Sequence, residues 1–188
     1  MIFAGHIGLT LAIAKYGPRA IVDMSGRVKP TSGSHNFRPS WVERLDDRAL
    51  VVGSVLPDIV DKPLALFIAP TLVGHSLRNY GHTLVFAILM LAAAIALAAL
   101  VKRQWPVVLA LASTGHLLLD MMWYSHRILL WPFSASTFSP RFIHEWGPDP
   151  DLLYVAAEAA GIVVLCYVGF RLLARRQVRQ WLSTGFGA

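Results

Sequence analysis

His116 and Asp120 lie four residues apart inside an apolar run, and together they could carry out chemistry. On a helix this spacing stacks both side chains on one face, one turn apart. An imidazole and a carboxylate so placed can hold one metal ion, and a buried carboxylate needs some partner. A charged aspartate is costly inside a membrane helix and usually marks function there. The alternative is a hydrogen-bonded polar pair that only joins helices.

Other histidines and carboxylates could complete such a site. Asp58 follows a proline, and it and Asp61 could bind a metal or, alternatively, cap a helix start. His75 and His82 flank Arg78, whose guanidinium could bind a substrate phosphate or pair with Asp58 or Asp61. Their spacing predicts a polar stripe on a helix that begins early. The candidate metal ligands from these patterns are His75, His82, Asp58, His116 and Asp120, and the candidate catalytic residues are Asp58, Asp120 and Arg78.

The chemistry that this set supports is metal-assisted hydrolysis. Imidazole and carboxylate ligands favour zinc, with manganese or iron as alternatives. A divalent metal lowers the pKa of bound water and leaves a position open for substrate. Two metals bridged by a carboxylate would also fit these ligands. A rival function is a non-enzymatic transporter or sensor of metal ions or protons that uses the same cluster.

The composition is that of an integral membrane protein. The chain has 188 residues, enough for one domain over residues 1–188, with 55% hydrophobic and 15% charged residues. Soluble domains carry roughly 25% charged residues. The uncharged run from Thr83 to Val101 reaches the length of about 18 residues that a transmembrane helix needs. The only cysteine, Cys166, excludes an internal disulfide and a cysteine-based zinc site.

The chain divides into apolar segments separated by polar loops. We predict an all-α, polytopic membrane protein with about four to five membrane-embedded helices. A first segment covers residues 2–16, and a second, over 49–73, is expected to break at Pro57 and resume to about Pro70. Further helices are expected over 83–101 and from Pro106 through His116 and Asp120. A last helix is expected to end at Ala174. A polar loop over 17–48 and an aromatic-rich loop over 123–151 separate these helices.

The net charge of +6 comes from basic residues in loops and at helix ends. Such residues orient a membrane protein, so they do not indicate nucleic-acid binding. The loop 17–48, Lys102 with Arg103, and the C-terminal arginines would face the cytoplasm. The loop 123–151 and most candidate ligands would then lie on the outer side. The predicted partners are therefore the lipid bilayer and a small-molecule or lipid phosphoester.

These motifs resemble a bacterial inner-membrane family of metal-dependent hydrolases, the LexA-regulated membrane hydrolases. The resemblance rests on His6, the segments 53–61 and 115–120, the Arg78–His82 element and the segment 129–133. That family is similar in its His and Asp pattern to zinc-dependent phospholipases C. The resemblance implies a multi-pass protein of the inner membrane that acts on a phosphoester or lipid-like substrate. It also implies metal ligands at His6, Asp58, His82, His116 and Asp120, although His6 alone on an apolar face would suit a core residue.

Overall fold

The computed structural model describes residues 3–25, 45–138 and 150–185 of the chain, and these ranges consist of helices joined by turns, with no strand. The fold is therefore all-α, as the sequence predicts. Its helices are α1 (Phe3–Ser25), α2 (Asp47–Pro63), α3 (Leu84–Val101), α4 (Trp105–Leu119), α5 (His126–Leu129), α6 (Pro150–Ala174) and α7 (Val178–Thr184). Three short turns of π- or 3-10 helix are η2 (Leu64–Ile68), η3 (Tyr80–His82) and η4 (Met122–Tyr124).

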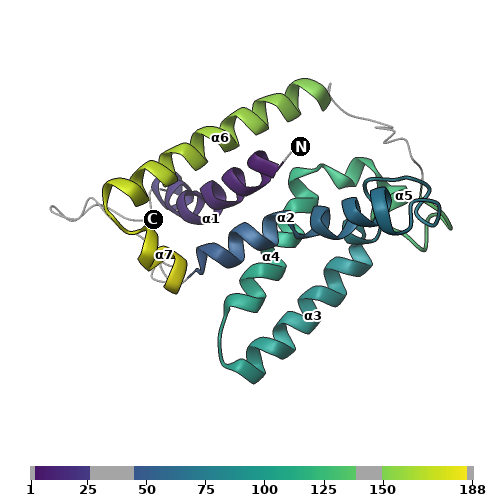
Figure 1. Cartoon of the computed structure of the whole chain (residues 1–188), viewed down its shortest axis with the longest axis horizontal. Helices are drawn as coiled ribbons and strands as arrows, with labels where there is room; N and C mark the ends of the chain where they lie inside the picture. Colours follow the sequence, from purple (N-terminus) through teal and green to yellow (C-terminus); the bar gives the residue numbers. More distant parts are fainter. Residues whose placement is uncertain (1–2, 26–44, 139–149, 186–188) are drawn as a thin grey trace.

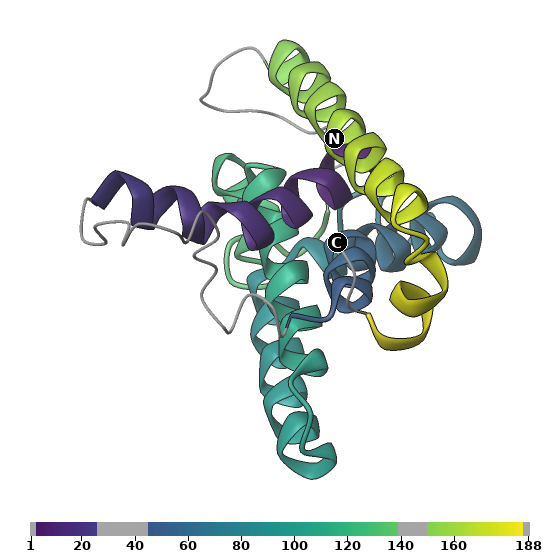
Figure 2. The same ribbon diagram turned by 90° about the vertical axis from the view of Figure 1, so that its left-hand side faces the viewer.

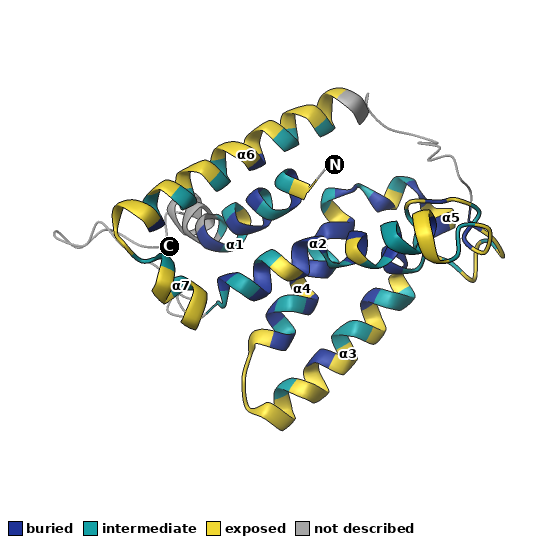
Figure 3. Cartoon of the chain, viewed as in Figure 1, coloured by how far each residue is buried: buried dark blue, intermediate teal, exposed yellow. Residues whose placement is uncertain are grey.

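Helix α2 is the centre of the arrangement. It packs against α4 on one side and α1 on another, while α3 folds back along α4 and α6 crosses α1 (Figures 1 and 2). Buried residues concentrate on α2 and on the part of α4 that faces it, whereas α3 and α6 are mostly exposed (Figure 3). Helices α2 and α4 therefore provide the interior in which a site can be enclosed.

Two apolar clusters lie along these helices and leave a polar layer between them. One includes Leu50 of α2 and Val108 of α4, and the other includes Ala65 and Leu117. The chain between the two clusters carries the buried acidic and histidine side chains of α2 and α4. Within the described residues, buried charged side chains of α2 and α4 face each other only in this polar layer.

The described residues contain two helices that are long and apolar enough to cross a membrane. They are Leu84–Val101, with mean hydropathy 3.0, and Leu152–Ala174, with mean hydropathy 2.0. Only 11% and 6% of these stretches are buried, so their apolar side chains do not form a protein core. The predicted number of four to five spans is higher than helix length supports, because the apolar helices Phe3–Lys15 and Trp105–Leu119 are shorter.

The predicted break at Pro57 is wrong, because α2 continues through it to Pro63 and then passes into η2. Proline removes one backbone donor from a helix. The donor that Pro57 lacks would have bonded the carbonyl of Gly53, so α2 loses a single backbone bond here while α4 packs along it. In the same turn, Nδ1 of His116 in α4 donates to the carbonyl of Ser54 at 2.7 Å and joins the two helices.

The predicted helical stripe from His75 to His82 is also wrong. The chain turns in this region and α3 begins only at Leu84. His75 has a left-handed φ of 56°, and the Asp61 carboxylate accepts the backbone N–H groups of Asn79 and Gly81. These bonds to α2 hold the segment in a turn, which residue spacing alone does not indicate.

Both predicted loops contain helix. Helix α1 runs to Ser25, so the loop expected over 17–48 is shorter than predicted. The helix continues past Pro18, because a proline in an established helix removes only one hydrogen bond. Residues 26–44 lie outside the described residues. Within 123–151, α5 and part of η4 are short helices, and residues 139–149 lie outside the described ranges.

Helices α1 and α6 cross closely through glycines. A Cβ added at Gly8 would collide with the backbone of Gly161, and one at Gly5 would meet the Glu158 side chain. Glu158 also accepts the N–H of Ala4 at 3.0 Å through Oε1. Since His6 lies between these two glycines in the sequence, this crossing fixes the start of α1 and the position of His6.

We expect Gly8→Val to destabilise the protein, because the added side chain pushes α1 away from α6. Overpacking of this kind costs about 1–3 kcal/mol or more. Gly169→Val is the matched control, since a Cβ at Gly169 of α6 meets no atom within 4 Å. Thermal unfolding in detergent, followed by circular dichroism, measures both variants. Equal Tm values for the two variants would contradict the close crossing.

Candidate metal centre

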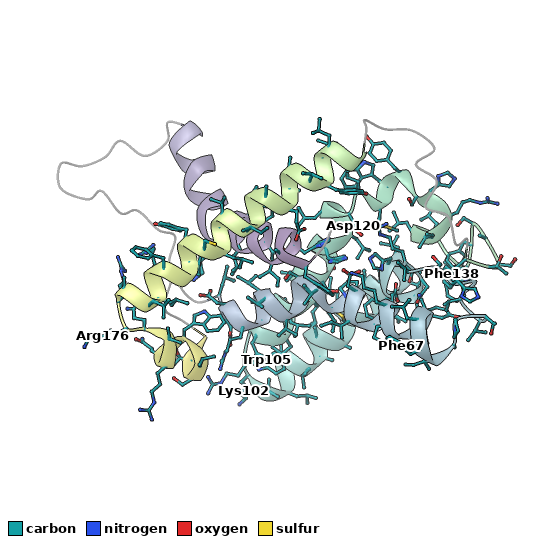
Figure 4. The ribbon with its side chains drawn as sticks, turned by 45° about the horizontal axis from the view of Figure 1, so that its top comes forward. Phe67, Lys102, Trp105, Asp120, Phe138 and Arg176 are labelled. Carbon is teal, nitrogen blue, oxygen red and sulfur yellow. The ribbon has the colours of Figure 1, made fainter. Side chains whose placement is uncertain are left out.

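The polar layer gathers side chains from four parts of the chain. Helix α2 provides Asp58 and Asp61, η3 provides His82, and the end of α4 provides His116 and Asp120. His6 reaches the same place from α1. All are buried, with exposed fractions between 0% and 4%. Figure 4 shows the labelled Asp120 in the interior, away from the labelled basic residues Lys102 and Arg176.

The Nε2 atoms of His82 and His116 face each other at 3.2 Å. His116 donates through Nδ1 to the carbonyl of Ser54 at 2.7 Å, and Nδ1 of His82 is 2.7 Å from the Asp61 carboxylate. A neutral imidazole with a proton on Nδ1 keeps a lone pair on Nε2. Two such lone pairs repel each other at this distance. The pair is therefore arranged to share a cation, either a proton or a metal ion.

Two carboxylates approach the same point. Oδ1 of Asp58 lies 3.7 Å from Nε2 of His82 and 4.0 Å from Nε2 of His116. Oδ2 of Asp120 lies 3.6 Å and 3.9 Å from the same two nitrogens. Ligands about 2.0–2.2 Å from a tetrahedral zinc ion lie roughly 3.3–3.6 Å from one another. The two nitrogens and two oxygens are thus close to the spacing that such an ion requires.

Neighbouring groups orient both imidazoles. Asp61 is fully buried and holds His82 through Oδ2, while its two oxygens also accept the N–H groups of Asn79 and Gly81. The Ser54 carbonyl holds His116. Histidine ligands usually donate their second ring N–H to a carboxylate or carbonyl, which fixes the tautomer and raises ligand basicity. Both imidazoles have this support.

His6 forms a second group with His116 and Asp120. Its ring stacks on the His116 ring at 3.8 Å between centroids, and its Nε2 lies 3.1 Å from Oδ1 of Asp120. Asp120 thus directs one oxygen to His6 and the other to the histidine pair. The donor atoms of His6, His116 and Asp120 lie within 4.8 Å of one another, as do those of Asp58, His82 and His116. The geometry allows one ion with His6 as a supporting residue, or two ions that share Asp120.

Two cations border the carboxylates. Arg78 donates through Nε to Oδ2 of Asp120 at 2.6 Å, and Lys62 donates to Oδ2 of Asp58 at 2.8 Å. Burial disfavours the charged form of His82, but its bonds to Asp120 and Asp61 outweigh this, and the pKa of His82 is raised above its ordinary value. Three buried aspartates, Asp58, Asp61 and Asp120, surround the histidine pair, so their negative charge exceeds what Arg78 and Lys62 neutralise and favours a further cation.

The structure brings together five of the six histidine and aspartate residues named as ligands, namely His6, Asp58, His82, His116 and Asp120. His75 is exposed in a turn, so we leave it out of the ligand set. Arg78 contacts Asp120 rather than the expected Asp58 or Asp61. Sequence reasoning missed Lys62, although its position four residues after Asp58 is the usual spacing of a helical ion pair.

The comparison with protein families agrees with the membrane character of the chain. The model of the YdjM inner membrane protein family matches residues 1–178. The chain belongs to this family. The YdjM match spans the whole centre, from His6 to Asp120, and supports the predicted inner-membrane location. It carries no similarity to hydrolases or phospholipases C, and no curated protein or solved structure matches the chain.

We expect the detergent-purified protein to contain near-stoichiometric divalent metal, and His116→Ala and Asp120→Asn each to lose it, because each removes a donor atom. His126→Ala is the control, since His126 is exposed outside the centre. Elemental analysis measures the metal, and circular dichroism checks that the variants fold. Folded wild-type protein without metal, even after incubation with zinc or manganese, would exclude the metal centre.

Asp61→Asn tests the support of His82. We expect metal affinity to fall by about 10–100-fold, the usual effect of removing such a supporting carboxylate. Competition with a chelator measures the affinity. Asp46→Asn, at the other end of α2, is the control and should bind metal as wild type does. An unchanged affinity in Asp61→Asn would show that Asp61 only shapes the 79–82 turn.

Proposed function

We propose that this protein is a membrane-embedded, metal-dependent hydrolase that cleaves a phosphoester, either of a small molecule or of a lipid. The observation that carries the proposal is the pair of facing Nε2 atoms at 3.2 Å, with carboxylates of Asp58 and Asp120 beside them. Nitrogen and carboxylate donors in this number favour zinc, and manganese or iron would also fit. His82, His116 and Asp120 would hold the ion and leave a position for water beside Asp58, and His6 would be a ligand of a second ion that shares Asp120.

The protein's own groups suit a phosphoester. A bound divalent ion supplies Lewis-acid activation of water and of a phosphoryl oxygen. Three aspartates and two cations, Arg78 and Lys62, give the centre a net charge of −1, so a divalent ion would make it net positive. An anionic phosphate would then be attracted. Arg78 lies partly exposed at the edge of the centre and carries a guanidinium, the group that binds phosphate oxygens in a fork.

The two catalytic aspartates have different surroundings. Lys62 holds Oδ2 of Asp58, so Oδ1 faces the centre and can accept a proton from water. Asp120 is held by Arg78 and His6 and thereby keeps one oxygen directed at the histidine pair. Hydrolysis of a phosphoester would consume one water and release an alcohol and a phosphate group. The proton from water would pass to Asp58 and then to the leaving alcohol oxygen.

We further propose that the protein is multi-pass, with α1, α2 and α4 embedded beside α3 and α6. The exposed apolar faces of α3 and α6 support this placement, since lipid is the medium that would cover them. Lys102 follows α3 and Arg175 and Arg176 follow α6, at the ends far from the centre (Figure 4). With these basic ends in the cytoplasm, the centre lies toward the outer face.

We expect the metal-loaded protein to hydrolyse a chromogenic phosphodiester, and Arg78→Lys to lower kcat/KM while retaining metal. The loss should be about 100-fold, the scale of removing one positioned donor. Arg48→Lys is the control, because Arg48 pairs with Asp46 at the other end of α2.

Metal-loaded, folded protein that cleaves no phosphomonoester or phosphodiester would contradict the hydrolase proposal. Movement of metal across vesicles by the same preparation would then favour the transporter function. Equal kcat/KM in Arg78→Lys and wild type would remove Arg78 from the catalytic set.

A further inference from the structure

A groove of about 460 Å³ lies between α1, α2 and α4, apart from the metal centre's own residues. Its lining includes Thr10 and Ala14 of α1, Leu50 of α2, and Val108, Ala112 and Gly115 of α4. The floor is buried, with Leu50, Val108 and Ala112 at most 6% exposed. Its rim is open, with Ile13, Leu111 and Leu118 between 56% and 61% exposed. We call it the α1–α4 groove.

The α1–α4 groove begins beside the metal centre. On α1, Thr10 follows His6 by one turn, on the same face of the helix. On α4, Leu119 is adjacent to Asp120 and Gly115 is adjacent to His116. The far end lies at Gly17, Leu45 and Val108, toward the basic end of α3 and α4. The groove therefore runs from the centre toward the side expected to face the cytoplasm.

The chemistry of the groove is that of a hydrocarbon site with one polar group. The lining is apolar apart from the hydroxyl of Thr10. That hydroxyl is buried and has no hydrogen-bond partner in the part of the chain that the structure describes. A buried hydroxyl without a partner is costly, so a ligand atom that accepts from it would be favoured. The hydroxyl lies between the centre and the apolar lining. In a bound lipid, the ester oxygen that joins the head to the acyl chain would occupy the same position.

We propose that the α1–α4 groove binds an acyl chain of a glycerophospholipid whose phosphoester lies at the metal centre. The chain lies along α4, and the Thr10 hydroxyl donates to an ester oxygen. The open rim of Ile13, Leu111 and Leu118 faces bilayer lipid, so a lipid enters sideways without leaving the membrane. The reacting phosphoester rests on the proposed function, whereas occupancy of the groove by an acyl chain does not.

Two matched glycines test the groove. A Cβ added at Gly115, in the lining, or at Gly169, on α6, meets no atom within 4 Å, and both residues are half-buried in helices. Gly115→Phe fills the groove without a backbone collision, and Gly169→Phe adds the same side chain elsewhere. Both remove a helical glycine, so both retain or improve helix propensity. Metal content and thermal unfolding confirm that each variant keeps its fold and centre.

The probe is a phosphatidylglycerol with a diazirine on its acyl chain, at trace level in phospholipid nanodiscs. After illumination, mass spectrometry compares labelling of residues 10–17 and 108–119 with labelling of α3. We expect wild type and Gly169→Phe to label the groove segments above α3. Gly115→Phe should lower that ratio by about tenfold, as expected for the loss of one tenfold step in affinity. Equal labelling of groove and α3, or no effect of Gly115→Phe, overturns the proposal.

The same preparations separate this proposal from the hydrolase proposal. Labelling needs no turnover, so His116→Ala should label the groove as wild type does even though it lacks metal. In hydrolysis, Gly115→Phe should lose activity on a long-chain phospholipid and keep it on a short, water-soluble phosphodiester. Groove labelling with no hydrolysis of either substrate would reject the hydrolase alone. Unchanged long-chain hydrolysis in Gly115→Phe would reject the groove alone.

Discussion

The approach of two imidazole nitrogens, on His82 and His116, is the constraint on which the rest of the structure depends. Each ring is held from behind, one by a carboxylate and the other by a backbone carbonyl. Both nitrogens therefore present electron pairs to the same point at 3.2 Å. An arrangement of this kind is unfavourable without a cation, and the carboxylates beside it increase the demand for positive charge. The surrounding helices keep the rings in place despite this cost.

The central helix α2 meets several requirements of that centre at once. Asp58 faces the histidine pair, while Asp61, less than one turn later, holds His82 and the turn that carries it. Ser54, one turn earlier, offers its carbonyl to His116 next to the proline that interrupts the helix's own bonding. A single helix face thus positions residues from η3 and α4. Two apolar clusters pack on either side of this face.

The N-terminal helix adds the last component through its contact with α6. Glycines allow α1 and α6 to approach closely, and Glu158 satisfies an N–H at the start of α1. His6 is thereby held against the His116 ring and beside Asp120. The same helix continues as one wall of the α1–α4 groove. Helix α1 therefore contributes both to the centre and to the neighbouring apolar groove. It would thereby connect the proposed reaction site with the lipid around the protein.

The sequence by itself determined the local features of this protein. Its apolar runs predicted helices α3 and α6 with nearly the observed ends, and the spacing of His116 and Asp120 placed both at one end of α4. Hydropathy and helical periodicity depend only on neighbours in the chain, so these predictions needed no tertiary contacts. The same locality explains why the order of apolar segments indicated a membrane protein.

Only the tertiary structure decided how these features combine. Contacts between segments far apart in the chain pair Arg78 with Asp120 and place Asp61 behind His82. They also leave His75 in a turn outside the centre. Likewise, α2 continues through Pro57 while it is packed along α4, a contact that local propensity cannot express. Buried charges choose partners by geometry and desolvation, and both are fixed only when the helices meet.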